Sequence, residues 1–442
     1  MQENKVNKNK VFVIGVGMTK FLKPGSHNYS YIDLGKQSIQ NALKDSKIDY
    51  KLVDTAFVGY VFESSCAGQR VLYEIGITGI PIVNVNNNCA TGSTAFNLSY
   101  NSIAYGQSNV SLALGFDVMQ KGPLPLDVTN PIAPTYNYAK DLILSYNYND
   151  KIPSAPQLFG FAGKEHMEKY GSTQNHLSKI SVKNYKHGSN NPYAQFQNPN
   201  INIKTVNNTK SICYPLNKLH CCPTSDGSAC AILCNEEFVI KNKLQDNAVE
   251  ILACVLETDK DNTFSSKSRI DIVGYQTTKR ACQKALKLAN IKSINEIGAI
   301  ELHDCFSSNE LITYEALGLC NQGEAGQFID NGDNTYGGKF VVNPSGGLTS
   351  KGHPLGATGI AQITELCWQL RNKADKRQIK NLKYAMSHNL GLGTAIVITI
   401  LKKYCIEENN KLNANIHSKI KPDQYNQNYN INNYSRNISA KF

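Results

Sequence analysis

The sequence predicts an α/β fold in which one structural unit occurs twice. Short apolar runs typical of strands alternate with stretches of helical spacing, which is the pattern of α/β proteins. One such stretch recurs farther along the chain, together with the elements that follow it. The 442 residues, 41% hydrophobic and 18% charged, suit a globular protein with a large core, and the longest apolar runs are too short to span a membrane.

The N-terminal copy begins with a strand-like run at residues 10–17. The repeated stretch comes next: Gln-Asn-Ala-Leu-Lys at 40–44 recurs as Gln-Lys-Ala-Leu-Lys at 283–287, an offset of 283 − 40 = 243 residues. In each copy the following apolar run predicts a strand, at 56–62 and at 299–303. Matches in register with one another indicate a duplication.

Each copy then places a reactive residue between a strand and a helix. A strand-like run at 82–86 precedes Cys89, and another at 340–343 precedes His353, and a predicted helix follows each. Cys89 and His353 therefore occupy equivalent places. A pseudo-twofold axis would bring the matching loops of both copies to one central cleft, and His303, at the end of the second copy's strand, would join them there.

The remaining elements complete the two halves. The helix after Cys89 is expected to end at Gly106 and to lead into a strand at 110–114, and the run 395–401 predicts the last strand. Between the copies lies an irregular insertion rich in Asn, Pro and Tyr, which we interpret as a loop domain covering the cleft. The predicted divisions are the N-terminal half, 1–120; the loop domain, 121–222; the C-terminal half, 223–405; and an Asn-rich tail, 406–442, expected to be disordered.

Charge, cysteine content and the two termini bear on the protein's partners and cellular compartment. Lys and Arg exceed Asp and Glu by 46 − 35 = 11, which permits an anionic partner without requiring one. Thirteen scattered cysteines are typical of free thiols in a reducing compartment. The polar N-terminus lacks the apolar stretch of a signal peptide, so secretion is not expected. The C-terminal Ala440-Lys441-Phe442 is similar to a peroxisomal import signal except in its last residue.

A cysteine on a polar turn is the first candidate for catalysis. Asn86-Asn-Asn-Cys89 leads into a predicted helix, and the N–H groups at a helix N-terminus favour a thiolate, so we expect a lowered pKa at Cys89. The thiolate is the nucleophilic form of cysteine. A small buried core residue is the structural alternative.

Two histidines supply candidate bases. His353 lies between glycine and proline just before a helix, a rigid position that suits a base beside a nucleophile. His303 and Cys305 are two residues apart at a predicted strand end, so both side chains would face one pocket. A loop histidine bonded to a carbonyl and a core histidine beside a core cysteine remain the structural alternatives.

Residues 387–393 form a glycine-rich sequence, predicted to be a turn whose N–H groups could hold an oxygen anion.

Other motifs argue against a metal, nucleotide or nucleic-acid site. The vicinal pair Cys221-Cys222 lacks the spacer of zinc sites, so we expect no metal. Gly15-Val-Gly17 is not completed by a third glycine, no Walker loop occurs, and the basic residues are dispersed. We therefore expect neither a dinucleotide nor a nucleic acid as partner.

Five segments together resemble the thiolase superfamily, and within it the sterol-carrier-protein type, over about Val11 to Leu401. The segments are Asn88-Cys89-Ala-Thr-Gly-Ser, His303-Asp-Cys-Phe, Asn343-Pro-Ser-Gly-Gly, Gly352-His353-Pro-Leu-Gly and His388-Asn-Leu-Gly-Leu-Gly. The resemblance implies a duplicated core in five layers, α-β-α-β-α. It also implies that Cys89 is the acyl-accepting nucleophile and that His353 takes its proton.

The resemblance assigns the other site residues as well. Most thiolases carry a second catalytic cysteine in a Cys-x-Gly-x-Gly turn, which here reads Asn389-x-Gly391-x-Gly. Cys305 is implied to supply the missing thiol as the acid for carbon, with His303 as the donor to the enolate oxygen. Gly391, Asn389 and His388 are implied to bind substrate, with the N–H groups of Cys89 and Gly391 holding a second oxyanion.

The implied reaction is cleavage of 3-oxoacyl-CoA by coenzyme A in lipid β-oxidation, which gives acyl-CoA and acetyl-CoA, or propionyl-CoA from branched chains. Coenzyme A is a substrate, and no metal or redox cofactor is expected. The resemblance implies a homodimer and a peroxisomal location, with a cytoplasmic location as the alternative. Reverse condensation, a decarboxylating ketoacyl synthase and a catalytically silent acyl-CoA-binding or scaffold subunit remain alternative functions.

Overall fold

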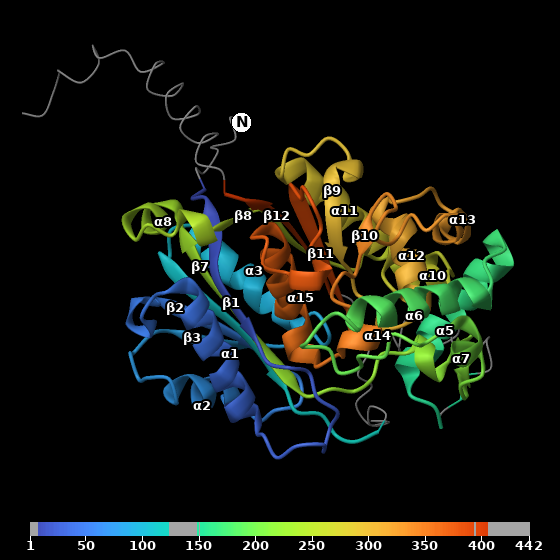
Figure 1. Ribbon diagram of the computed structural model, residues 1–442, viewed down its shortest axis with the longest axis horizontal. Coiled ribbons are helices and arrows are strands. Elements are labelled where there is room, and N and C mark those ends of the chain that lie inside the picture. The colour runs from blue at the N-terminus through green and yellow to red at the C-terminus, as the bar shows by residue number, and fades with distance from the viewer. Residues whose placement is uncertain (1–7, 123–147, 150, 393–394, 405–442) are drawn as a thin grey trace, which may run out of the picture. The chain divides into compact units, whose positions relative to one another are not determined.

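The computed structural model describes residues 8–122, 148–149, 151–392 and 395–404 (Figure 1). Ten strands are hydrogen-bonded in the order β10-β9-β11-β12-β8-β1-β7-β4-β2-β3. Their bounds are β1 Val11–Met18, β2 Thr55–Gly59, β3 Ile82–Val85, β4 Val110–Asp117, β7 Gly227–Asn235, β8 Val249–Thr258, β9 Ile297–Glu301, β10 Val341–Val342, β11 Tyr384–Gly391 and β12 Ala395–Lys403. The predicted tail at 406–442 lies outside the described residues.

The order of the strands confirms the predicted duplication. In the first half β2 runs parallel to β3 and β4, while β7 is antiparallel to β4 and β1. In the second half β9 runs parallel to β10 and β11, while β12 is antiparallel to β11 and β8. The two half-sheets meet through a short antiparallel ladder in which Phe12 and Val13 of β1 pair with Glu250 and Val249 of β8.

The helices complete five layers. Helices α3 (Thr91–Ala104) and α15 (Leu355–Leu370) pack against each other between the half-sheets, and each contacts strands of both. Helix α1 (Tyr31–Ser46) contacts β1 and β7, and α11 (Tyr275–Leu288) contacts β8 and β12. All but one residue of α15 is buried, as expected of a helix packed on every side.

The other helices are short, except for two in the insertion. Their bounds are α2 Ala67–Tyr73, α5 Ser154–Tyr170, α6 Gln174–Gly188, α7 Ile203–Asn207, α8 Glu236–Lys241, α9 Asn262–Ser265, α10 Arg269–Ile272, α12 Ser307–Leu317, α13 Ala325–Asp330 and α14 Gly347–Lys351. A separate two-stranded ladder joins β5 (Ser211–Cys213) to β6 (Leu216–Asn217). Among the described helices, none combines the length and apolar character that crossing a membrane would need.

The structure corrects three expectations. The insertion is not irregular throughout, because apolar residues such as Leu158 and Ile180 hold α5 and α6 against the core. β7 belongs to the first half-sheet, so the second half begins after it and not at residue 223. The segment predicted as a turn continues as strand β11 up to Gly391, because it pairs with β12 along its whole length.

Candidate active site

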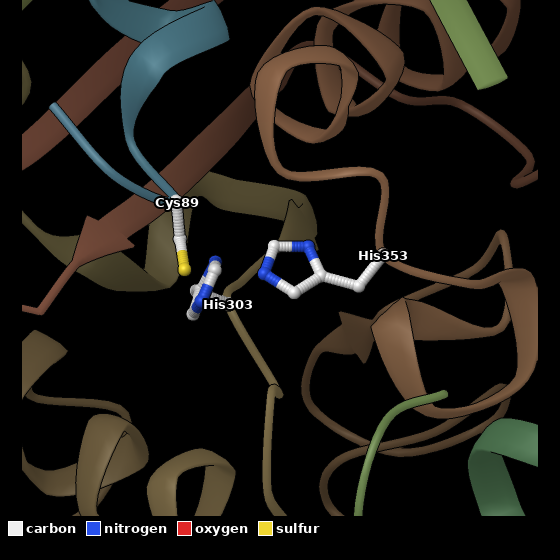
Figure 2. Close-up of side chains that lie close together, drawn as sticks. All are labelled: Cys89, His303 and His353. Atoms are coloured by element: carbon white, nitrogen blue, oxygen red, sulfur yellow. The ribbon is translucent and has the colours of Figure 1, made fainter. Parts of the chain in front are cut away.

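One thiol and two imidazoles meet where the two halves face each other (Figure 2). The sulfur of Cys89 and a ring nitrogen of each of His303 and His353 all lie within 4.8 Å of one another. The two rings meet edge to face, with centroids 5.0 Å apart. Cys89 and His353 each lie two residues before the first residue of a central helix, α3 and α15 respectively. The structure thus brings together three of the four residues that the sequence singled out as catalytic.

The turn that carries Cys89 is fixed from both sides. The Asn87 N–H donates to Thr91 Oγ1 at 2.8 Å, which ties the turn to α3. The Asn88 amide, on a residue with a φ of 49°, donates to the Leu392 carbonyl at 2.9 Å. Gly391 lies against the same turn, since a Cβ there would come within 2.2 Å of the Asn87 carbonyl oxygen.

The expectation of a lowered pKa at Cys89 is wrong in direction. Burial raises the pKa of the Cys89 thiol to about 12, and the nearby Asp117 carboxylate adds to the rise. The N–H groups of Cys89 itself and of Leu392 face the sulfur and oppose the rise. Desolvation of the thiolate therefore outweighs the helix N-terminus. Cys89 rests as a thiol, and its nucleophilicity requires a base.

His353 is suited to be that base. Its N–H donates to Ser225 Oγ at 2.9 Å, and Gly352 precedes it with a φ of 108°, where a Cβ would come within 2.6 Å of the same hydroxyl. His353 Nδ1 lies 2.7 Å from Thr358 Oγ1, whereas Nε2 has no partner among the described residues. Burial lowers the pKa of His353 to about 3, and the Lys351 ammonium contributes. The ring is neutral at physiological pH.

His303 is held by strand β11. Its N–H donates to His388 Nδ1 at 3.4 Å, and its Nδ1 lies 2.9 Å from the Asn389 amide nitrogen. Burial, with smaller contributions from His353 and His388, lowers the pKa of His303 well below its usual range. Its Nε2 has no partner in the part of the chain that the structure describes. A second neutral imidazole thus lies beside Cys89 and His353 with one ring nitrogen that has no hydrogen-bond partner among the described residues.

Cys305 lies beyond the end of β9, which stops at Glu301, and not on the strand itself as the sequence suggested. Its carbonyl accepts from the Cys222 N–H at 2.9 Å. Burial raises the pKa of the Cys305 thiol well above its usual range, with contributions from Cys222 and Cys89. Cys305 is therefore protonated, as an acid must be. The sequence did not identify Cys222 as a neighbour of the site, because its contact with Cys305 joins distant segments.

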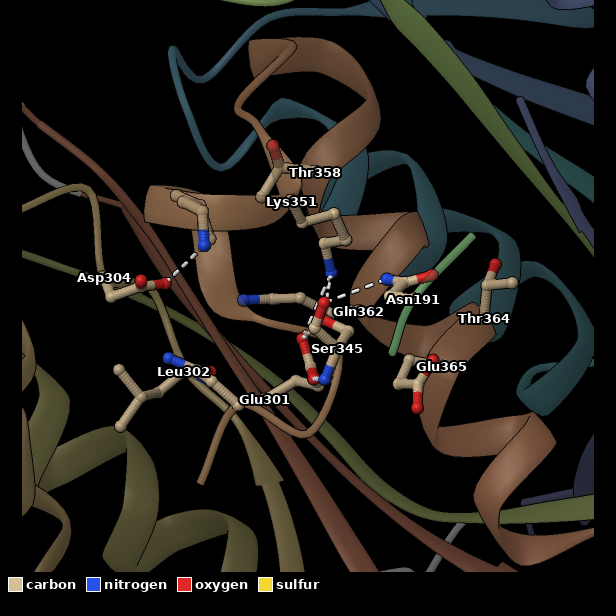
Figure 3. Close-up of polar contacts among 12 residues, drawn as sticks. Asn191, Glu301, Leu302, Asp304, Ser345, Lys351, Thr358, Gln362, Thr364 and Glu365 are labelled. Carbon is tan, nitrogen blue, oxygen red and sulfur yellow. Dashed lines mark hydrogen bonds and ion pairs between the residues drawn. The ribbon is translucent and has the colours of Figure 1, made fainter. Parts of the chain in front are cut away.

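A buried polar network joins the loops behind the histidines (Figure 3). Lys351 lies 3.2 Å from Glu301 and donates to Ser345 Oγ at 2.7 Å. Asp304 accepts from the N–H groups of Leu348 and Thr349 at the start of α14, the helix that leads to His353. The residues on either side of His303 therefore anchor the loop that carries His353.

His388 and Asn389, both expected to bind substrate, are hydrogen-bonded to other residues of the protein. His388 is buried with both ring nitrogens occupied, Nε2 by Thr278 Oγ1 at 3.0 Å and Nδ1 by the His303 N–H. Asn389 is buried and directed at the His303 ring. Both side chains contact His303 from β11, an interior strand between β9 and β12, and neither is exposed.

Comparisons with known proteins identify the family. The family model described as "Thiolase, N-terminal domain" matches residues 11–237, and "Thiolase C-terminal domain-like" matches 259–403. Sterol carrier protein 2 of Homo sapiens is 53% identical over 395 residues, which cover 89% of this chain and 72% of that protein.

Solved structures share the fold at low sequence identity. The "Ltp2-ChsH2(DUF35) aldolase" has a TM-score of 0.74 at 21% identity, over 91% of this chain and all of that one. Human mitochondrial 3-ketoacyl-CoA thiolase in complex with CoA has a TM-score of 0.65 at 18% identity, over 89% and 98% of the two chains. Because an aldolase and a thiolase share this fold, the reaction must be argued from the side chains in the pocket.

Proposed function

This chain belongs to the thiolase family, and from that premise we propose that it cleaves 3-oxoacyl-CoA with coenzyme A to acyl-CoA and acetyl-CoA. The observation that carries the proposal is the convergence of the Cys89 thiol with two neutral imidazoles, each of which has an Nε2 without a hydrogen-bond partner among the described residues. The thiol supplies a nucleophile, and the imidazoles can serve as a base and as a hydrogen-bond donor.

In the first half-reaction His353 Nε2 takes the proton of Cys89 as the sulfur attacks the 3-keto carbon. The bond between carbons 2 and 3 then breaks, and its electron pair forms the enolate of acetyl-CoA. His303 Nε2–H donates to the enolate oxygen, and Cys305 gives its proton to the enolate carbon. The acyl group stays on Cys89 as a thioester.

In the second half-reaction coenzyme A attacks this thioester, and its thiol proton returns to Cys305. The tetrahedral oxyanion needs N–H donors, and those of Cys89 and Gly391 remain our proposal for them. Cys89 leaves as a thiolate and recovers its proton from His353. All protons return to their starting places, so the cycle needs no metal or redox cofactor.

A thiolysis assay with paired cysteine variants tests this proposal. Cys89→Ala should abolish cleavage and the acyl-enzyme seen by mass spectrometry. Cys305→Ala removes the acid used in both half-reactions, so it should lose cleavage while Cys89 still reacts with iodoacetamide. Cys234→Ala, a buried cysteine on β7, is the matched control and should retain activity. Cleavage surviving Cys89→Ala would refute the proposal, and binding of acyl-CoA without turnover by the unaltered chain would favour a silent binding subunit.

We also propose where the protein acts and how many subunits it has. We place the reaction in peroxisomal lipid β-oxidation by resemblance to the family, which a fluorescent fusion imaged with a peroxisomal marker tests. We propose a homodimer as the working unit, which light scattering of the purified protein tests.

A further inference from the structure

The Asn389 side chain is directed at His303 from the strand next to it. We propose that Asn389 is a positioning residue that fixes His303 as an Nε2–H donor, in the tautomer opposite to that of His353. The inference rests on the proposed function only for its kinetic consequence, since the tautomer itself can be measured without substrate.

Strand register explains why these two residues meet. β11 runs parallel to β9, and Ser387 pairs with Glu301. Asn389 lies two residues after Ser387, and His303 lies two residues after Glu301. The amide nitrogen of Asn389 is 2.9 Å from Nδ1 of His303. Both side chains are fully buried. Among the described residues, Asn389 is the one hydrogen-bond partner of this Nδ1.

The contact sets the tautomer of His303. An amide NH₂ can donate a hydrogen bond but cannot accept one, so His303 Nδ1 must be the acceptor. A neutral imidazole carries only one proton, which then resides on Nε2. That nitrogen has no partner in the described structure, and it is the one that remains for an oxygen anion in the pocket.

The opposite tautomer is set at His353. The Thr358 hydroxyl donates to the Pro354 carbonyl at 3.0 Å, so its oxygen is left to accept from His353 Nδ1–H at 2.7 Å. The Nε2 of His353 therefore carries a free lone pair. One pocket thus holds two neutral imidazoles in different states, a base at His353 and a donor at His303.

The proton on His303 Nε2 also disfavours a metal ion at this site. Cys89, His303 and His353 are close enough to hold one, with all ligand atoms within 4.8 Å. A metal needs a lone pair from each imidazole, and the proton on His303 Nε2 blocks one of them. The Asn389 contact therefore favours oxyanion binding over metal binding in this trio.

A carboxylate at position 389 should reverse the tautomer. In Asn389→Asp the carboxylate accepts from Nδ1–H, which leaves a lone pair on His303 Nε2 facing the enolate oxygen. Losing one such donor typically costs about 10² to 10³ in kcat. The new negative charge also raises the pKa of His303, and below that pKa the doubly protonated ring regains its Nε2–H. We therefore expect kcat of this variant, corrected for any change in the wild type, to rise as pH falls.

Three measurements separate this role from a purely structural one. Long-range ¹H–¹⁵N spectra of histidine-labelled protein, with the His303 signals assigned through His303→Gln, should show the Nε2–H tautomer in the wild type and Nδ1–H in Asn389→Asp at high pH. In Asn389→Asp the KM for the 3-oxoacyl-CoA should differ from that of the wild type by less than about threefold. The rate of Cys89 alkylation, which depends on His353, should be the same in Asn389→Asp as in the wild type.

The controls leave the inference open to refutation. Asn97→Asp alters another buried asparagine, whose amide donates to the Cys254 carbonyl, and should show neither the kcat loss nor its pH dependence. Asn389→Leu should lose kcat at every pH, because it removes the donor without adding a charge. An Nδ1–H tautomer in the wild type, or full kcat in Asn389→Asp at pH 8, would overturn the assignment. A wild type with the expected tautomer but no thiolysis would refute the proposed function alone.

Discussion

The raised pKa of Cys89 gives the sharpest prediction, and His353→Gln is the variant that isolates it. With a pKa of about 12, only about 10⁻⁴ of the thiol is ionised at pH 8, against about one quarter of a free cysteine with a pKa of about 8.5. Without the base, alkylation must pass through this small thiolate fraction. We therefore expect the rate in His353→Gln to rise about 10³-fold from pH 7 to pH 10, whereas a free cysteine would gain only about 30-fold.

The wild type should follow a different course. Since the pKa of His353 is lowered to about 3, its Nε2 is available as a base throughout the range from pH 6 to pH 10. Base-assisted alkylation is then independent of pH at the low end, and the thiolate route adds to it only at high pH. The two proteins should differ most near pH 6, where the variant has almost no thiolate.

Iodoacetamide labelling measures both profiles, with the Cys89 peptide quantified by mass spectrometry at each pH. A plateau above pH 9 in His353→Gln would mean that burial does not hold the Cys89 proton, and the reasoning from desolvation would fail. Equal rates in wild type and variant at pH 6 would instead remove His353 as the base.

Two further predictions use matched pairs. Thr358→Val should slow Cys89 alkylation and lower kcat about 10- to 100-fold, because it leaves His353 Nδ1–H buried without an acceptor. The matched control is Thr364→Val on the same helix, where the hydroxyl donates to the Ile360 carbonyl. This control should be near wild type in the same assays. Gly391→Ala should lower kcat about 10²-fold, because its Cβ would displace the turn that carries Cys89. The control Gly76→Ala, whose Cβ would have only ordinary contacts, should keep its kcat. Equal activity in the two variants would show that the turn has room to move.

The sequence was sufficient for the duplication and for the place of the nucleophile. The recurrence of 40–44 at 283–287 is local, and the equivalent positions of Cys89 and His353 follow from counting along each copy. The two half-sheets bear this out strand by strand. Such a pattern survives because each copy must bury the same faces of the same elements.

What the sequence could not give depends on contacts between distant segments. Residues 387–391 begin a glycine-rich sequence that is typical of a turn, yet pairing with β12 makes them a strand. Residues 154–188 are polar enough to suggest a loop, yet α5 and α6 find apolar surface on α12 and form helices. Local propensity is weak compared with burial, and burial is decided by the whole fold.

The sign of the Cys89 pKa shows how such contacts alter chemistry. The helix N-terminus predicted from the sequence is present, but burial of the Cys89 thiol outweighs it, and burial likewise raises the pKa of the nearby Asp117 to about 7. Thiols and imidazoles in this pocket therefore rest neutral, and charge arises only as the reaction proceeds. A site of this kind gains little from a preformed thiolate and depends instead on how its donors and base are oriented. Substitutions that turn a ring or reverse a tautomer should accordingly cost more activity than substitutions that change the net charge near the pocket while keeping those hydrogen bonds.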